Sequence, residues 1–449
     1  MPFLFLKYIQ PTWYFNLKPF KGVIPYWVDY RKLPPDLKPL IEFDAKYRTE
    51  EARLVDASFQ AWHKGIIISD PSIDLPITQL PIKATIEDNY RFIRKYFNKV
   101  WVYYCLVLRI LSLNNPFREI SAFNRTKKVK KKDLYITFNQ DVSYQEFKSE
   151  LLLSTPFTSV IIPTLNRYKY LKDVFLDLEK QNYKNFEIIV VDQTDNPDRS
   201  FYDKFNLKQN IIFQDGKGQW LARNAAIREA KGDLLLFYDD DSRVAPDWIA
   251  EHIKALDYYK ADISAGVSFS KVGGEIPRNY RFFRWADQFD SGNALVKREV
   301  FKKIGLFDRQ FDKMRMGDGE FGLRAYLYGF KSISHPYASR LHLKVNSGGL
   351  RQVGSWDAFR TQQLFSPKPI PSVLYFYRTY FPGSYVNNAL VLGVLPSLVP
   401  YKFKNNKVIY PFGVLIGILF LPVLAIQVFK SWTQSGRMLK EGNKIEYIN

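Results

Sequence analysis

The chain has 449 residues, 46% of them hydrophobic, so it can bury at least one large core and contain more than one domain. This composition excludes a largely disordered protein. Its 65 Lys and Arg against 45 Asp and Glu give a net charge of +20, which favours a polyanionic partner such as nucleic acid, anionic lipid or a phosphate-bearing substrate. The single cysteine, Cys105, excludes an internal disulfide and a cysteine-rich zinc site, and it suits a reducing compartment.

Residues 1–150 contain no chemical motif that we can assign. They mix aromatic and proline-containing stretches with a predicted helix over Ile86–Leu113 and end in the basic run Arg125–Lys132. The first residues lack the basic lead, apolar run and small-residue cleavage site of a signal peptide, so we expect most of the protein to be cytosolic. We treat residues 1–150 as an accessory region of unknown role.

From Thr158 the pattern changes to short β-branched runs that alternate with amphipathic stretches, which is typical of βα units. The pattern predicts strands over 159–165, 186–193, 210–215 and 233–239, and helices over 168–181, 219–230 and 246–259. We therefore expect an α/β fold with a mostly parallel open sheet and flanking helices. Such sheets bind ligands beyond the carboxyl ends of their strands.

The region 367–449 contains two long uncharged segments, Tyr385–Tyr401 and Val408–Phe429. The second is long enough to cross a hydrocarbon core as a helix, although Pro411 and Pro422 interrupt it. Lysines on both flanks fit an interfacial or re-entrant hairpin at least as well. A third interpretation is a pair of apolar helices packed on the rest of the protein. We expect a hydrophobic and basic helical region that associates with a membrane.

Three adjacent carboxylates, Asp239, Asp240 and Asp241, follow the fourth predicted strand. Because they repel one another, they cannot all be buried without a counter-cation. A hard divalent ion such as Mg²⁺ or Mn²⁺, bridged to phosphate oxygens, suits them. On its own, an acidic turn that caps the next helix is the commoner interpretation.

Other predicted strands end in polar groups at the same edge of the sheet. Asp192 ends the second strand, and the first strand runs into the segment Pro163–Arg167. Asp192 is suited to accept hydrogen bonds from a nucleobase or ribose, and the turn after Pro163 could pack against the base. A loop-capping aspartate is an equally good interpretation of Asp192.

The ordered segments TSVIIPTLNR, FEIIVVDQTD and GKGQWLARNAAIREAKGDLLLFYDDDS resemble the family 2 glycosyltransferases, which have the GT-A fold. The resemblance implies a catalytic domain over residues 155–350. It also implies a nucleoside-diphosphate-sugar donor, Mg²⁺ or Mn²⁺ as cofactor, and an acceptor that is a glycan or a lipid-linked glycan. Members of this family often build bacterial surface polysaccharides.

The resemblance continues downstream. Phe289–Asp308 is similar to the segment that lines the acceptor site, and MGDGEFGLRAYLYGF is similar to the family's acidic motif. By position, Asp318 is the expected catalytic base and Glu320 takes the second acidic place, while Gly317 replaces the usual first acid. A helix N-terminal acid, stabilised by the helix dipole, is the alternative interpretation of Asp318.

The expected site residues fall into three further groups. The donor-binding group is Pro163, Asn166, Arg167, Asp192, Arg223, Asp239 and Asp240; the metal ligands are Asp239, Asp241 and His342; the acceptor-binding group is Trp285, Asp287, Gly292, Asn293 and Glu320. His342 could instead be a structural strand-end histidine, and Trp285 and Asp287 could equally be a packed indole and a surface acid.

The sequence thus predicts an inverting glycosyltransferase that acts in cell-surface polysaccharide biosynthesis, peripheral or monotopic at the cytoplasmic face of the inner membrane. An anionic membrane surface is an expected partner, and nucleic acid is not. A nucleic-acid-binding protein would fit the charge and the aromatic content, but it does not predict acidic strand ends. An inactive GT-A scaffold is the remaining alternative, against which the retained Asp239, Asp241 and Asp318 argue.

Overall fold

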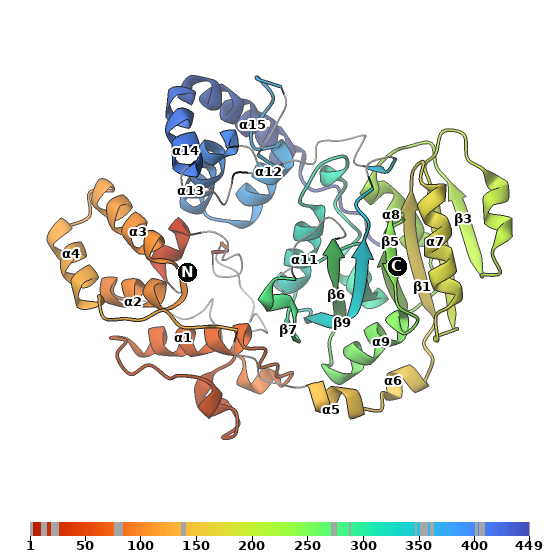
Figure 1. Cartoon of the computed structure of the whole chain (residues 1–449), viewed down its shortest axis with the longest axis horizontal. Helices are drawn as coiled ribbons and strands as arrows, with labels where there is room; N and C mark the ends of the chain where they lie inside the picture. The colour runs from red at the N-terminus through yellow and green to blue at the C-terminus, as the bar shows by residue number, and fades with distance from the viewer. Residues whose placement is uncertain are drawn as a thin grey trace.

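The protein is described from a computed structural model. The described residues are 3–9, 16–18, 27–75, 84–135, 141–270, 276–286, 289–345, 348–350, 358–359, 363–399, 403 and 409–448. Figure 1 shows a sheet with flanking helices on one side of the molecule, and two helical regions, from the two ends of the chain, on the other.

One mixed sheet forms the centre of the molecule, with the strand order β3-β2-β1-β4-β8-β6-β9-β5 and with β7 paired to β9. Its strands are β1 (Thr158–Thr164), β2 (Phe186–Asp192), β3 (Gln209–Phe213), β4 (Leu234–Tyr238), β5 (Ser242–Val244), β6 (Ile263–Ser270), β7 (Arg284–Trp285), β8 (Asn293–Lys297) and β9 (Ser332–His342).

The helices of the sheet region are α7 (Tyr168–Glu179), α8 (Gln219–Glu229), α9 (Trp248–Tyr258), α10 (Arg298–Ile304) and α11 (Gly317–Leu327). Those before the sheet are α1 (Glu50–His63), α2 (Ile86–Tyr96), α3 (Lys99–Leu111), α4 (Pro116–Arg125), α5 (Asp141–Glu146) and α6 (Glu150–Leu153). Those after it are α12 (Pro371–Tyr380), α13 (Gly383–Val394), α14 (Ile409–Leu419) and α15 (Leu421–Glu441).

The first half of the sheet confirms the predicted βα pattern. Strands β3, β2, β1 and β4 are mutually parallel, and β1, β2 and β4 are buried along their whole length because helices cover them. In this register Thr164 lies beside Asp192. The carboxyl ends of these strands therefore meet at one edge, as the sequence predicted.

The second half of the sheet is mixed, and sequence periodicity did not reveal it. Strand β8 runs antiparallel to β4 and β6, and the long strand β9 pairs with both β6 and β5. The pairing of β5 with β9 sets Ser242 opposite His342. As a result the end of β9 lies directly beside Asp241.

The region before the sheet packs against it through indole hydrogen bonds. Trp62 Nε1 donates to the backbone carbonyl of Trp285 at 3.0 Å, and Trp27 Nε1 donates to the hydroxyl of Tyr326 at 2.8 Å. The predicted single helix over 86–113 is in fact two helices, α2 and α3, which meet at Phe97 and Asn98.

The region after the sheet is helical, as expected. The uncharged segment 408–429 is divided at Phe420 between α14 and α15, with Pro422 in the first turn of α15, where proline is tolerated. Within the described part of the chain, no helix is both long enough and apolar enough to span a membrane.

Candidate active site

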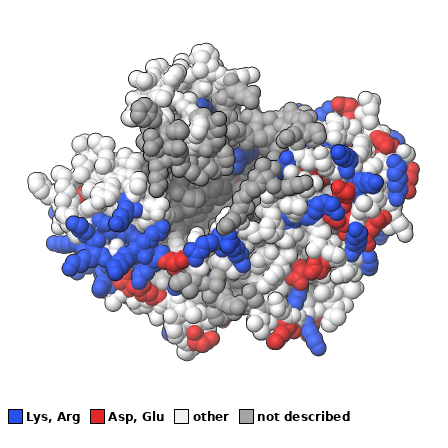
Figure 2. Space-filling model, in the orientation of Figure 1, with Lys and Arg blue, Asp and Glu red and all other residues white. Residues whose placement is uncertain are grey.

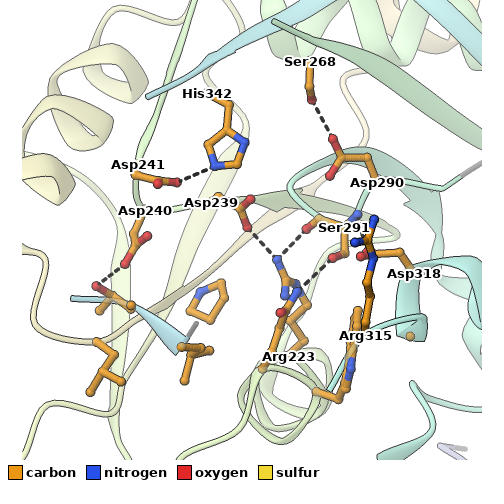
Figure 3. A pocket seen from close by; sticks show the side chains of 18 of the residues that line it. Arg223, Asp239, Asp240, Asp241, Ser268, Asp290, Ser291, Arg315, Asp318 and His342 are labelled. Atoms are coloured by element: carbon orange, nitrogen blue, oxygen red, sulfur yellow. Dashed lines mark hydrogen bonds and ion pairs between the residues drawn. The ribbon is translucent and has the colours of Figure 1, made fainter. Parts of the chain in front are cut away.

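A cavity of about 540 Å³ opens at the carboxyl edge of the sheet. It is lined by Pro163, Thr164, Leu165, Arg167, Gln219, Trp220, Arg223, Asp239, Asp240, Asp241, Ser268, Asp290, Ser291, Met314, Arg315, Met316, Gly317, Asp318, Arg340, His342, Lys344, Gly349 and Leu350. Figure 3 shows acidic and basic side chains facing one another across it. The cavity lies where the parallel topology predicts a ligand site.

The three adjacent aspartates are paired with arginines, and Arg167 contacts both Asp240 and Asp241. Asp239 accepts from Arg223 at 2.8 Å and from Arg340 at 2.7 Å. Asp240 accepts from Arg167 and from the hydroxyl of Thr164, both at 2.8 Å. Their mutual repulsion is therefore already offset by arginines within the chain, which the sequence argument did not consider.

Asp239 and Asp240 differ in pKa because their surroundings differ. Burial alone would raise the pKa of Asp239, but Arg340 and Arg223 hold it well below its usual value. Burial raises the pKa of Asp240 to about 6, even though Arg167 acts in the opposite direction. Asp239 is thus an anion throughout the physiological range, as a cation ligand must be.

Asp239, Asp241 and His342 can bind one metal ion. Their potential ligand atoms all lie within 4.8 Å of one another, and His342 Nε2 is 3.3 Å from Asp241 Oδ1. Figure 3 shows the imidazole directed at the Asp241 carboxylate. Two carboxylates and one imidazole form a ligand set that fits a divalent ion such as Mn²⁺.

Asp318 lies on the opposite side of the cavity, in the first turn of α11. Its Oδ1 accepts a hydrogen bond from the backbone N–H of Ser291 at 3.0 Å. Burial and the nearby Asp290 carboxylate raise the pKa of Asp318, against the opposing influence of Ser291 and Arg223. A raised pKa brings a carboxylate closer to the working range of a general base.

Gly317 has a packing reason to replace the acid that is usual at this position. A Cβ atom there would overlap the indole of Trp220, which is itself buried. Only glycine allows α11 to begin this close to α8.

Arg223 lies between the two acidic sides of the cavity. Its Nη2 donates to Asp239 and to the backbone carbonyl of Ser291, both at 2.8 Å. Its Nε and Nη1 are buried and make no hydrogen bond. Since unsatisfied buried donors are costly, they point to an anionic ligand in the cavity.

Asp192 does not line the cavity. Its carboxylate is buried and accepts hydrogen bonds from the hydroxyls of Tyr168 at 2.5 Å and Tyr202 at 2.8 Å, and from the backbone N–H of Thr194 at 3.0 Å. Its predicted role toward the donor stays a prediction. Of the other predicted donor residues, Pro163 and Arg167 line the cavity, and Asn166 lies in the adjoining turn with a φ of 56°.

Three of the predicted acceptor residues are buried and packed within the fold, and their role toward the acceptor stays a prediction. Trp285 is 1% exposed, so its ring cannot stack on a sugar. Asn293 is buried, and its amide donates to the carbonyls of Val267 and Ala338. Glu320 is buried and paired with Arg324.

The other two predicted acceptor residues have different outcomes. Gly292 lies beside the cavity, and a Cβ atom there would overlap the Asp239 carboxylate and the Arg340 guanidinium. Asp287 lies outside the described residues.

Sequence reasoning missed Asp290, Ser291, Arg315 and Arg340. Asp290 binds Arg340 through both carboxylate oxygens at 3.0 Å, so Arg340 joins it to Asp239. A signal for Arg340 was available, because alternate residues of a strand share a face and Arg340 precedes His342 by two. Asp290 and Ser291 lie in the segment that the resemblance had already assigned to the acceptor site.

An open α/β sheet, with an acidic cluster at its carboxyl edge and a carboxylate facing it, is the architecture expected of the GT-A fold. Residues 159–319 match the model of Glycosyl transferase family 2.

Two proteins of Bacillus subtilis are similar to parts of this chain. YfnE of Bacillus subtilis, an uncharacterized glycosyltransferase, is 33% identical over 119 residues, which is 25% of this chain and 30% of YfnE. YwdF of the same organism, also uncharacterized, is 27% identical over 223 residues, 46% of this chain and 81% of YwdF.

A third relative has a solved structure. TarS of Staphylococcus aureus, a poly(ribitol-phosphate) beta-N-acetylglucosaminyltransferase, is 30% identical over 112 residues, 23% of this chain and 20% of TarS. The structure of TarS 1–349 with UDP-GlcNAc covers 65% of this chain and 97% of that chain, with a TM-score of 0.42 and 17% identity.

Proposed function

We propose that this protein is an inverting glycosyltransferase that moves a sugar from a nucleoside-diphosphate donor to a hydroxyl group of its acceptor. The observation that supports this best is that one cavity contains both the cation ligands Asp239, Asp241 and His342 and, facing them, the carboxylate of Asp318. An inverting transfer needs these two elements on opposite sides of the reacting carbon. It needs no carboxylate nucleophile, in contrast to the retaining glycosidases.

In the proposed reaction Asp318 takes the proton from the acceptor hydroxyl. The oxygen then forms a bond to the anomeric carbon while the bond from that carbon to the diphosphate oxygen breaks, and the nucleoside diphosphate leaves with the electron pair. Ser291 holds Asp318 in place through its backbone N–H. The two unsatisfied donors of Arg223 are available to the departing diphosphate.

Asp239, Asp241 and His342 would hold Mn²⁺ or Mg²⁺, which when bound neutralises charge on the diphosphate. Arg223 and Arg340 already pair with Asp239, so they would share this carboxylate with the metal.

The finer proposal is that the acceptor is a cell-surface glycan or its lipid-linked precursor and that the protein works at the cytoplasmic face of the inner membrane. Two observations support it. TarS, whose name describes transfer of N-acetylglucosamine to poly(ribitol-phosphate), resembles part of this chain. Large apolar side chains are also exposed around the junction of α14 and α15, including Leu419 and Phe429.

The test is calorimetric binding and hydrolysis of a panel of UDP-, GDP- and dTDP-sugars, with Mn²⁺ or with a chelator. We expect Asp241→Ala to lose metal-dependent donor binding. We expect Asp318→Asn to keep donor binding and lose turnover by at least about a hundredfold, because a positioned base contributes that much.

Glu299→Gln removes one carboxylate from the exposed face of α10 and serves as the matched control. It should behave as the unmodified protein. If no donor binds under any metal condition, the enzyme proposal fails and the scaffold alternative gains weight.

A further inference from the structure

We propose that the α3–α4 hairpin, residues 99–125, together with the basic run, residues 125–132, docks on the surface of an anionic lipid bilayer. The inference deepens the proposed membrane setting and rests on it only for the location of the acceptor. The residues of this surface lie in the accessory region, far along the chain from the cavity residues.

Helix α3 is apolar on two faces. One face, with Val102 and Cys105, is buried against the neighbouring helices. The other face bears Val100, Tyr103, Val107 and Leu111, each more than half exposed and spaced at helical intervals of three and four residues. A helix with two apolar faces requires a second apolar environment, and the described chain leaves most of this second face exposed, with Phe123 packed on Tyr103.

The apolar stripe continues through the turn onto α4. Leu113 in the turn is 96% exposed and Phe117 on α4 is 82% exposed, with Ile120 one helical turn further on. Single exposed apolar residues are ordinary, but a continuous row along two helices marks a surface that binds something apolar.

The hairpin is held as a preformed unit. Arg109 of α3 forms a buried ion pair with Glu119 of α4 at 2.7 Å, and the hydroxyl of Tyr90 on α2 donates to the same carboxylate at 3.0 Å. These charged groups bind one another inside the hairpin, and its outer face bears apolar side chains. Because the two helices are already fixed relative to each other, docking requires little further ordering of the chain.

Cations flank the apolar row. From Lys99 to Lys132 the sequence has nine Lys and Arg and one acid, Glu119, which is the buried one. Lys127, Lys128 and Lys130 are exposed. Figure 2 shows blue side chains gathered at the left of the molecule, where Figure 1 places α2 and the segment after α4, beside a largely white surface over the hairpin.

An apolar face beside a basic patch complements an anionic bilayer, whose headgroups attract lysines while its acyl region accepts the apolar row. Nucleic acid would use the lysines but would leave the aliphatic row exposed, since bases stack on aromatic side chains. The mainly aliphatic Val100, Val107, Leu111 and Leu113 therefore favour lipid.

The test is co-sedimentation of the full chain with phosphatidylcholine vesicles, with and without phosphatidylglycerol, at low and high salt. We expect binding to the anionic vesicles that weakens with salt. The triple variant Lys127→Gln, Lys128→Gln and Lys130→Gln should bind them roughly a hundredfold less well, because each lysine near such a surface contributes several-fold.

The same change of charge on α7 and its C-cap residue, at the opposite side of the view in Figure 1, is the matched control: Lys169→Gln, Lys172→Gln and Lys180→Gln. It should leave binding unchanged. The apolar variant Leu111→Ser, Leu113→Asn and Phe117→Ser should lose the part of the binding that high salt does not remove. Leu153→Ser with Tyr328→Ser, exposed elsewhere, should keep it.

Donor binding by each variant reports that the cavity is intact. A protein that turns over a donor sugar but ignores anionic vesicles overturns this inference and leaves the proposed transfer intact. If the Lys127 triple variant binds anionic vesicles as well as the unmodified protein does, the inference is also overturned. Binding to a single-stranded oligonucleotide, without binding to vesicles, overturns it too.

Discussion

Arg340 connects the two acidic parts of the cavity. It is buried and donates to Asp239 on the cation side and to Asp290 on the side of Asp318. Asp290 in turn accepts from the hydroxyl of Ser268 at 2.6 Å. A displacement of one carboxylate would therefore reach the other through a single rigid guanidinium.

The substitution Gly292→Ala tests how tightly Asp239 and Arg340 are packed. In Gly292→Ala the new Cβ would overlap the Asp239 carboxylate and the Arg340 guanidinium. We expect metal-dependent donor turnover to fall by about a hundredfold, since small misplacements of catalytic groups have effects of that size. Gly383→Ala, where the added Cβ meets nothing, is the control. Normal turnover in Gly292→Ala would show that the arrangement tolerates the shift.

The raised pKa of Asp318 predicts the acid side of the pH–rate profile. The base works when deprotonated, so turnover falls as the pH drops through a value above that of an ordinary aspartate. Asp290→Asn removes a like charge and should move this limb to lower pH, whereas loss of Arg223 would move it upward. The measurement is kcat/KM against pH, and an unmoved limb in Asp290→Asn would contradict the assignment of Asp318.

At the scale of elements, helix α11 has two separate tasks on two faces. Asp318 faces the cavity, while Glu320 is buried and binds Arg324 on the same helix and the hydroxyl of Tyr380 on α12 at 2.7 Å. Glu320 therefore ties α11 to the helical region that follows the sheet.

Replacing Glu320 should affect stability and spare the site. Glu320→Gln leaves Arg324 buried without its anion, so we expect the free energy of unfolding to fall by about 3 to 5 kcal/mol while donor affinity is kept. Tyr380→Phe removes only one hydrogen bond and should cost about 1 kcal/mol. Denaturant unfolding measures both. A selective loss of acceptor affinity in Glu320→Gln would restore the acceptor role first predicted for it.

At the scale of the whole molecule, the segment after α15 returns to the sheet region. The backbone N–H of Leu306 donates to Glu446 O at 2.7 Å, and the N–H of Lys444 donates to Asp308 Oδ1 at 2.9 Å. Glu446 also pairs with Arg228 on α8. The last described residues thus fasten the helical region to the sheet.

Removal of residues 443–449 should lower the free energy of unfolding by about 2 to 4 kcal/mol, since several hydrogen bonds and their apolar cover are lost together. Thermal denaturation measures this. Glu446→Gln, which removes only a half-exposed ion pair, should change it by less than about 1 kcal/mol. An unchanged melting temperature after the truncation would show that the contacts contribute little.

The local pattern of the chain was sufficient to predict the parallel half of the fold. Strands β1, β2, β3 and β4 and the helices between them follow from β-branched runs and helical periodicity, because these signals depend on near neighbours in sequence. Polar residues at the ends of these strands were predicted to meet for the same reason. Asp239, Asp241, His342 and Asp318 were all singled out from the sequence, and the structure brings them into one cavity.

Tertiary structure alone decided what each polar residue does. The partners of Asp239 come from α8 and from β9, about a hundred residues further along the chain, and no local pattern announces such a pairing. Burial likewise decided that Trp285, Asn293 and Glu320 hold the fold together, because a motif fixes a residue's type and not the direction of its side chain. Local sequence patterns were enough to predict the class of fold and the edge of the sheet where the site lies. Long-range packing determined which charges meet there, because charge pairing depends on distances that only the folded chain sets.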